Sequence, residues 1–236
     1  MKTPFGRTGG KKNLSKRIIN LFPNDYNLYV EPFVGAGNIY FKLPKEKQTN
    51  PMVINDLDDD VYIALKEIQN NAAFINSNIK RVKFTKDYFE EIKNKNDPIS
   101  VIEKLKTSYM ANGITFNFYH HLIKTDFLPF QEYLKNTIVL NETFEKIIEK
   151  YDNKDTFFYL DPPYENNSEN DYKHYVNPQD VYNSVKNIKG RFILSYNNSN
   201  SIKNLFAEFY IYPIETKYTR PTNKTIELLI SNFQLK

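Results

Sequence analysis

The chain has 236 residues, of which 40% are hydrophobic and 25% charged, with a formal net charge of +4, a composition typical of a globular protein. The absence of cysteine excludes disulfide bonds, thiolate metal ligands and a cysteine nucleophile, and three histidines argue against a histidine-rich zinc site, so we expect no metal. No apolar run approaches the length that spans a bilayer.

The N-terminal segment is basic. Residues 1–24 carry six lysines and arginines and no acidic residue. Such an arm suits a polyanion such as a nucleic acid, although a solvated tail has the same composition. The segment lacks the apolar centre of a secretory signal, and we therefore expect a cytoplasmic location.

The hydrophobic pattern of the first 71 residues predicts alternating helices and strands. It predicts a helix over 13–22, a strand over 28–30, a helix that ends near 43, a strand over 52–55 and a helix that starts near Asp58 or Asp59. The last helix has an apolar stripe of Val61, Ala64, Leu65 and Ile68, which predicts that it packs against a sheet.

Residues 72–136 interrupt this alternation. They are helical in pattern, polar and aromatic, and they contain Pro98, the Asn112-Gly113 pair and Pro129. The stretch is too long for a connection between a strand and a helix. It therefore predicts an inserted subdomain over 72–136 within a catalytic domain formed by residues 1–71 and 137–236.

The alternation resumes after residue 136. The pattern predicts strands over 137–140, 156–160, 191–196, 210–213 and 225–230, and helices over 144–149, 179–188 and 201–206. Strands that alternate with helices predict an α/β fold with a mostly parallel, twisted sheet and helices on both faces.

A glycine-containing segment follows the first predicted strand. It reads Glu31-Pro32-Phe33-Val34-Gly35-Ala36-Gly37. The two glycines let the backbone turn tightly and approach a ligand, and a helix start beyond them would offer free N–H groups. Asp56 ends the second strand about twenty residues later, where an acid binds the hydroxyls of an adenosine ribose. A tight turn and a helix-capping aspartate are the plainer interpretation, but the pair favours a nucleoside site.

The sequence Asp161-Pro162-Pro163-Tyr164 directly follows an apolar strand. The paired prolines fix the backbone and remove two N–H donors, which leaves the carboxylate and the first proline carbonyl as acceptors beside an aromatic ring. Two acceptors next to a flat platform suit a planar ring that carries an exocyclic amino group. A simple strand terminator is the alternative, but a buried aspartate without a partner would be costly.

These motifs, together with Gly9-Gly10-Lys11, Lys224 and residues 227–232, resemble the Dam-like DNA adenine-N6 methyltransferases in order and spacing. The resemblance covers nearly the whole chain and is weakest over 72–136. It implies a Rossmann-like methyltransferase fold, S-adenosylmethionine as cofactor, and double-stranded DNA as substrate. Asp161-Pro162-Pro163-Tyr164 also resembles signatures of methyltransferases that act on RNA or on protein glutamine.

The resemblance also implies roles for individual residues. The target adenine leaves the duplex and stacks on Tyr164, and its amino group donates to the Asp161 carboxylate and the Pro162 carbonyl. Asp161 lies between target and cofactor, and Asp56 binds the cofactor ribose. The remaining cofactor-binding residues that it implies are Arg7, Gly10, Lys11, Glu31, Phe33, Gly35, Gly37, Glu142 and Thr143.

Two positions depart from the family's pattern. Arg7 stands where the family usually has an aromatic residue, although a guanidinium also stacks flat. Glu142-Thr143-Phe144 replaces Gly-Asp-Phe, so a contact to the adenine amino group of the cofactor is either lost or supplied by Glu142.

The resemblance places DNA recognition in residues 72–136, where 109–118 and 125–130 resemble the family's recognition segment without its arginine. The candidate DNA-binding residues are Lys12, Asn112, Asn117, Tyr119 and Lys124. For each of them singly, a solvated side chain is the preferred interpretation. GATC is an expectation for the target sequence.

Three functions stay open at this level. They are a DNA adenine methyltransferase, a methyltransferase of RNA adenine or protein glutamine, and an inactive nucleic-acid-binding relic. A chain with one catalytic domain can act as a monomer. A partner restriction endonuclease and a bacterial or phage origin also remain open.

Overall fold

The computed structural model describes residues 2–6, 11, 13–79, 84–109, 112–117, 123–164, 175–217 and 224–235. Seven strands in this part of the chain form one sheet in the order β3-β2-β1-β4-β5-β7-β6. They are β1 (Leu28–Glu31), β2 (Met52–Asn55), β3 (Thr137–Leu140), β4 (Thr156–Leu160), β5 (Arg191–Asn197), β6 (Tyr210–Lys217) and β7 (Lys224–Ser231). Neighbours from β3 to β5 pair in parallel, whereas β7 runs antiparallel between β5 and β6.

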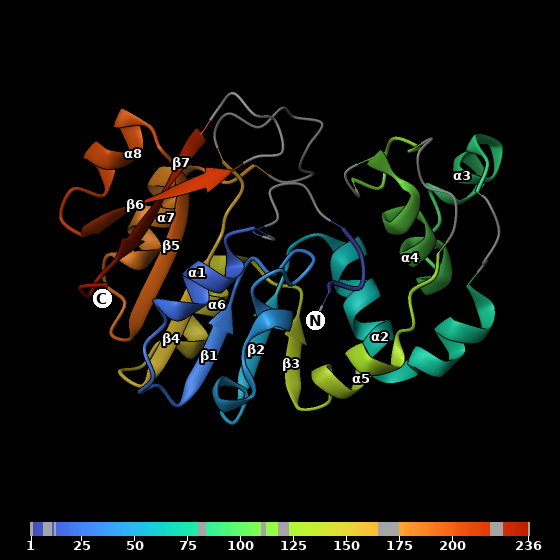
Figure 1. Ribbon diagram of the computed structural model, residues 1–236, viewed down its shortest axis with the longest axis horizontal. Coiled ribbons are helices and arrows are strands. Elements are labelled where there is room, and N and C mark those ends of the chain that lie inside the picture. Colours follow the sequence, from blue (N-terminus) through green and yellow to red (C-terminus); the bar gives the residue numbers. More distant parts are fainter. Residues whose placement is uncertain are drawn as a thin grey trace.

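Helices cover both faces of the sheet (Figure 1). They are α1 (Ser15–Asn20), α2 (Asp59–Asn78), α3 (Lys86–Ile92), α4 (Pro98–Thr107), α5 (Leu128–Leu134), α6 (Phe144–Tyr151), α7 (Pro178–Val185) and α8 (Asn200–Leu205). One hydrophobic core joins α1 and α2 to one face, and a second joins α6, α7 and α8 to the other. The doubly wound α/β fold predicted from the alternation is therefore confirmed, and with its parallel strands and two helical layers it is Rossmann-like.

The direction of strand addition reverses beside β1. The chain passes from β1 to β2 and β3 on one side, and β4 and β5 lie on the other side. The connections that leave the carboxyl ends of β1 and β4 therefore diverge and leave a crevice between them, where ligands bind in open α/β sheets. The Glu31–Gly37 segment and Asp161 both lie at this crevice.

One predicted element is wrong. The chain beyond Gly37 forms turns and a short 3-10 helix, η1 (Tyr40–Lys42), instead of an α-helix that extends to residue 43. Gly35 and Gly37 have φ values of 50° and 72°, in the left-handed region, so an α-helix does not begin between them. The N-terminus of a helix is accordingly not the cofactor-binding feature here.

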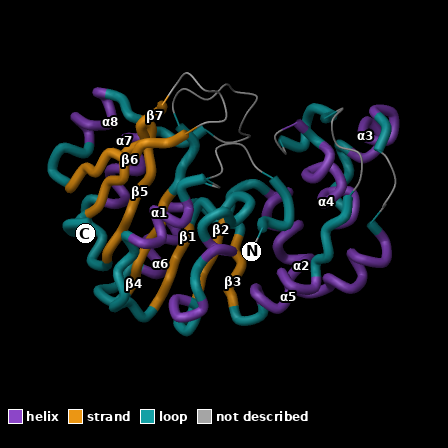
Figure 2. The backbone as a smooth tube through the Cα atoms, viewed as in Figure 1, coloured by secondary structure: helices purple, strands orange, loops and turns teal. Residues whose placement is uncertain are grey.

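The helices of residues 72–136 lie largely to one side of the sheet. Figure 2 shows α3 and α4 separated from the strands, with α2 and α5 between them and the sheet. Helix α2 crosses residue 71, where the backbone leaves helical geometry at Asn71 (φ −138°, ψ 37°). Pro98 and Pro129 lie in the first turns of α4 and α5, where a missing N–H costs nothing. The division into two domains stays a prediction.

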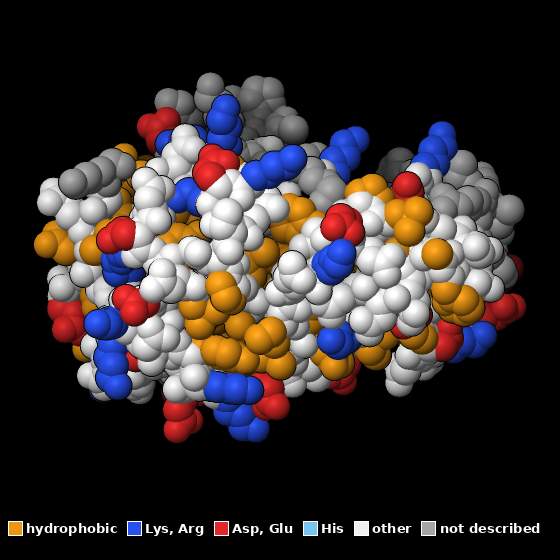
Figure 3. Space-filling view, turned by 90° about the horizontal axis from the view of Figure 1, so that it is seen from below, with side chains coloured by type: hydrophobic (Ala, Val, Ile, Leu, Met, Phe, Trp, Pro, Cys, Tyr) orange, Lys and Arg blue, Asp and Glu red, His pale blue; other side chains and the backbone are white. Residues whose placement is uncertain are grey.

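The surface seen from below carries charges of both signs (Figure 3). The face seen from below, at the amino ends of the parallel strands, shows acidic and basic side chains interspersed (Figure 3). Its charge therefore does not mark it as a site for a polyanion. Among the helices that the structure describes, none combines the length and apolar character needed to cross a membrane.

Candidate active site

Four side chains from three distant segments meet at the carboxyl end of β4. Lys11 Nζ lies 2.8 Å from Asp161 Oδ1 and 3.5 Å from Glu227 Oε2. The Tyr164 hydroxyl lies 3.4 Å from the same two carboxylate oxygens, and the Lys11 ammonium is 4.7 Å from the centroid of the Tyr164 ring. Asp161, Tyr164 and Lys11, which the sequence analysis singled out, are thus brought together with Glu227.

This cluster is shielded from water. Lys11 is 4% exposed and Glu227 6%. Burial raises the pKa of Asp161, and the repulsion from Glu227 adds to that effect, while the attraction and hydrogen bond of Lys11 oppose it. Lys11 therefore favours the ionised form of Asp161 in a place that otherwise disfavours it.

Tyr164 has a fixed orientation. Its ring stacks on Tyr196 of β5, with 5.6 Å between centroids and 27° between planes. Pro162 is buried and Tyr164 is half-buried. An aromatic platform with one ring partner already in place is held at the carboxyl edge of the sheet, directly after Asp161.

The Glu31–Gly37 segment is tied to β2. The Gly35 N–H donates to Asp56 Oδ2 over 2.7 Å, and the Asp58 N–H donates to Asp56 Oδ1 over 3.0 Å. Asp56 thus holds both the glycine-containing segment and the start of α2 with its two carboxylate oxygens.

Sequence reasoning missed Asn55, which joins three segments. Its side-chain amide donates to the carbonyls of Pro32 and Glu142, each over 2.9 Å, and its Oδ1 accepts from the Glu142 N–H over 2.8 Å. Asn55 is 1% exposed. A buried asparagine at the last position of a strand was the only signal available, because its partners lie far away in the sequence.

A cavity of about 190 Å³ opens beside these residues. Phe33 and Phe144, whose ring centroids are 5.1 Å apart, line it with Asp56, Glu142 and Thr143. Further lining residues that the sequence analysis did not assign to a site are Asn55, Leu57, Asp58, Glu145, Tyr175, Val176, Asn177 and Asp180. An apolar cleft with carboxylates on its rim has the size and chemistry for a purine nucleoside.

Glu31 is a buried acid. It is 2% exposed, and Tyr29 donates its hydroxyl proton to Glu31 Oε2 over 2.6 Å. Burial holds the pKa of Glu31 well above its usual value, and the carboxylates of Asp161 and Asp56 raise it further. A cationic ligand in the crevice would reverse this balance.

The candidate DNA-binding residues that the structure describes differ in their contacts and exposure. Asn112 Oδ1 accepts from the N–H groups of Ile114 and Thr115, so it shapes the turn around Gly113. Asn117 is half-buried, with its N–H bonded to the Thr107 carbonyl, and Lys124 is exposed. The other two DNA-binding candidates, Lys12 and Tyr119, lie outside the described residues, as do Arg7 and Gly10, which are predicted to bind the cofactor.

Comparison with known proteins identifies the family. Residues 8–220 match the family described as D12 class N6 adenine-specific DNA methyltransferase. A type II methyltransferase of Lactococcus lactis subsp. cremoris is 26% identical over 98% of this chain and 95% of its own length. A DNA adenine methylase of Haemophilus influenzae is 27% identical over 66% of this chain and 61% of its own length.

Solved structures resemble the chain only distantly. A putative methyltransferase from Streptococcus mutans, solved in complex with SAH, has a TM-score of 0.44 and 10% identity over 92% of this chain and 96% of its own. The family match, which extends over most of the chain, decides the assignment. The chain belongs to the D12 class of N6 adenine-specific DNA methyltransferases and uses S-adenosylmethionine as its methyl donor.

Proposed function

We propose that the chain methylates an adenine that has left the DNA duplex, and that Asp161, Pro162 and Tyr164 hold this base. The observation that carries the proposal is the Lys11–Asp161–Tyr164–Glu227 cluster, which lies at the crevice beside Asp56 and Glu31. A base stacked on Tyr164 would direct its amino group at the Asp161 carboxylate and the Pro162 carbonyl.

These two acceptors serve the chemistry of an aromatic amine. The lone pair of the exocyclic nitrogen is delocalised into the ring, so the nitrogen is a poor nucleophile. Acceptors that hold both N–H bonds favour a geometry in which the lone pair points away from the ring plane. Asp161 also stabilises the positive charge that develops on this nitrogen, because its carboxylate is already fixed by Lys11.

The residues of the crevice suit the methyl donor. S-adenosylmethionine supplies an electrophilic methyl group on a sulfonium centre. Asp56, which lines the cavity, would bind its ribose hydroxyls, and the part of the cavity lined by Phe33, Glu142 and Thr143 would take its adenine. Glu31, buried and close to Asp161, would face the cationic methionine end. Gly35 and Gly37 give the backbone its close turn around that end.

We assign DNA contact to the hairpin that ends α4. Ser108 and Phe116 form an antiparallel bridge, and the Asn112-Gly113 turn joins the two sides. Tyr109 and Ile114 on this hairpin are 55% and 52% exposed, so both side chains are accessible to a partner. Unstacked bases offer apolar faces that such side chains could contact.

Transfer of radiolabelled methyl groups from S-adenosylmethionine to unmethylated DNA tests the reaction. Nucleoside analysis and mapping of the label should give N6-methyladenine at a defined sequence, for which GATC is the first candidate. Label in RNA or protein but not in DNA would contradict the proposal. Cofactor-independent DNA binding without transfer would identify an inactive relic.

We further propose that the chain acts as a monomer in the cytoplasm. Its methylation would protect DNA from a cognate endonuclease of the same host. One cluster and one cavity from a single chain supply the proposed groups. The relative from Lactococcus lactis subsp. cremoris is described as a type II methyltransferase. Sedimentation with and without DNA tests the stoichiometry, and protection of methylated DNA from a nuclease of the same host tests the pairing.

A further inference from the structure

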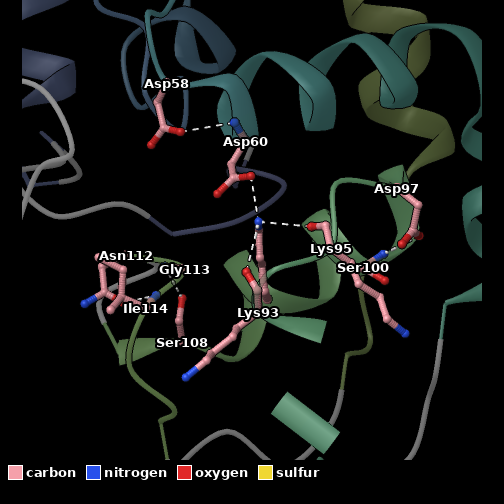
Figure 4. Close-up of polar contacts among 11 residues, drawn as sticks. Asp58, Asp60, Lys93, Lys95, Asp97, Ser100, Ser108, Asn112, Gly113 and Ile114 are labelled. Atoms are coloured by element: carbon pink, nitrogen blue, oxygen red, sulfur yellow. Dashed lines mark hydrogen bonds and ion pairs between the residues drawn. The ribbon is translucent and has the colours of Figure 1, made fainter. Parts of the chain in front are cut away.

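A series of hydrogen bonds leads from Asp56 into helix α2. The Asp58 N–H donates to Asp56 Oδ1 over 3.0 Å, and the Asp60 N–H donates to Asp58 Oδ1 over 3.1 Å. Asp58 is the N-cap of α2, and Asp58 and Asp60 are 2% and 4% exposed. Figure 4 shows Asp58 above Asp60, with the Asp60 carboxylate directed away from the helix. The position of the Asp56 carboxylate thus depends on the first turn of α2.

The Asp60 carboxylate binds a buried lysine of helix α4. Lys104 Nζ lies 2.8 Å from Asp60 Oδ1, and both side chains are 5% exposed or less. The same ammonium donates to the carbonyls of Lys93 and Lys95, which follow α3, over 3.4 Å and 3.3 Å. Charge-assisted hydrogen bonds in a site shielded from water hold their partners firmly. Lys104 therefore joins α2, α4 and the end of α3.

The other oxygen of Asp60 faces the hairpin turn. A Cβ atom placed on Gly113 would lie 3.3 Å from Asp60 Oδ2, closer than most such contacts, and Gly113 has a φ of 71°. The Gly113 N–H donates to Ser108 Oγ over 2.9 Å, and the Ser108 N–H donates to the Lys104 carbonyl over 2.8 Å. The Asp60 carboxylate thus binds Lys104 through one oxygen, and its other oxygen would contact any side chain placed at Gly113.

We propose that Asp60 and Lys104 couple cofactor binding at Asp56 to DNA binding by the hairpin, of which the structure describes residues 108–109 and 112–116. This inference rests on the proposed function for the roles of Asp56 and the hairpin. Cofactor hydroxyls that fix Asp56 also fix Asp58 and the first turn of α2, and so fix Asp60 against Lys104 and Gly113. The cofactor therefore binds the conformation that is competent to bind DNA more tightly than it binds the conformation that is not. Asp60 and Lys104 are positioning residues, since neither contacts a reacting atom.

The coupling is tested by measuring the affinity of the protein for a fluorescent DNA duplex with and without S-adenosylhomocysteine (SAH), the demethylated form of the cofactor. In the wild type we expect SAH to strengthen DNA binding by at least about fivefold, the low end of ordinary coupling between sites. The paired substitution Asp60→Asn with Lys104→Met removes both buried charges while it keeps their shape, which protects folding. It should reduce the enhancement to below about twofold, with the SAH affinity of the DNA-free enzyme unchanged.

Two further variants sharpen the result. Gly113→Ala, which places a methyl group against Asp60 and strains a left-handed residue, should also reduce the enhancement. Lys93→Met removes a surface charge that pairs with Glu90 and should retain it. Equal weakening of DNA binding with and without SAH in the paired variant would show a purely structural link and overturn the inference.

The binding measurements distinguish a wrong assignment of the two sites from an absence of coupling between them. If Asp56→Ala leaves SAH affinity intact, or Tyr109→Ala leaves DNA affinity intact, the assignment of those sites is wrong. If both variants lose binding as assigned but the wild type shows no SAH-dependent enhancement, only the coupling is refuted.

Discussion

Lys11 Nζ lies 2.8 Å from Asp161 Oδ1, across a gap of 150 positions in the sequence. Lys11 is buried and Asp161 is partly buried, and burial alone would favour protonation of the carboxyl group, whose pKa it raises. The ammonium counteracts this effect and fixes the direction of the oxygen. An acceptor prepared in this way needs little rearrangement when an amino group arrives.

Asp161→Ala should abolish methyl transfer while the fold and the affinity for SAH remain. We expect a loss of at least about 10²–10⁴ in the single-turnover rate, the usual contribution of a group that handles a proton-bearing centre. Circular dichroism and calorimetric SAH binding are the controls for structure. Lys11 keeps Glu227 as a partner at 3.5 Å, so the substitution does not strand its charge. A variant with most of its activity would refute the catalytic assignment.

Tyr164→Ala should weaken binding of the target base by roughly 1–3 kcal/mol, the stacking contribution of an aromatic side chain. Tyr164→Phe is the matched control, because it keeps the ring that stacks on Tyr196 and loses the hydroxyl that lies 3.4 Å from Asp161 and Glu227. We expect Phe to retain most of the affinity in a titration with DNA that contains an abasic site opposite the target adenine. Equal losses for Ala and Phe would rule out stacking.

Glu31→Gln should stabilise the empty protein at neutral pH. The pKa of Glu31 is raised above its usual value of 4.5 by burial, so the folded state binds its proton more tightly than the unfolded state. The wild type therefore loses stability as pH rises from about 4.5 towards the folded pKa, and the variant does not. Thermal melts from pH 4 to pH 8 should show the two proteins diverging as pH rises.

The same substitution should have the opposite effect on the cofactor. The sulfonium of S-adenosylmethionine favours ionised Glu31, so binding of S-adenosylmethionine to the wild type should release a proton and strengthen with pH. Calorimetry in buffers of different ionisation enthalpy measures this release. A Glu31→Gln protein that still released the proton would place the titrating group elsewhere.

Gly37→Ala should destabilise the protein by roughly 2–4 kcal/mol, from left-handed strain and overpacking together. Gly37 has a φ of 72°, and a Cβ atom there would lie 2.5 Å from Cδ2 of Phe41, which is buried and has no room to move. Denaturant unfolding measures the loss. Addition of Phe41→Leu should recover part of it if the collision matters; no recovery would assign the whole cost to the backbone.

The order of the elements was readable from the sequence. Runs such as 52–55, 137–140 and 156–160 are apolar and short, and the strands β2, β3 and β4 have these same limits. Local patterns succeed for β2 and β4 because a parallel strand buried on both faces needs continuous hydrophobic residues. β3 is an edge strand with Ile138 exposed, and its short apolar run was enough to predict it. The Asp161–Tyr164 turn and the Glu31–Gly37 segment could be found for a related reason, since each is contiguous and carries its own chemistry.

The local hydrophobic pattern did not predict the structure beyond Gly37 correctly. Its hydrophobic residues fit a helical period, but two left-handed glycines and the packing of Phe41 gave turns and a 3-10 helix instead. Propensity is a weak guide where glycine sets the backbone and tertiary contacts decide the rest.

The sequence by itself determined the layered α/β fold and the two segments that meet at its crevice. Only the tertiary structure decided which distant side chains complete the site. Glu227 joins Lys11 and Asp161, Asn55 joins β2 to the Glu142 segment, and Lys104 joins Asp60 to the hairpin. Contacts of this kind depend on strand order and helix packing, which bring together residues with no local relationship in the chain.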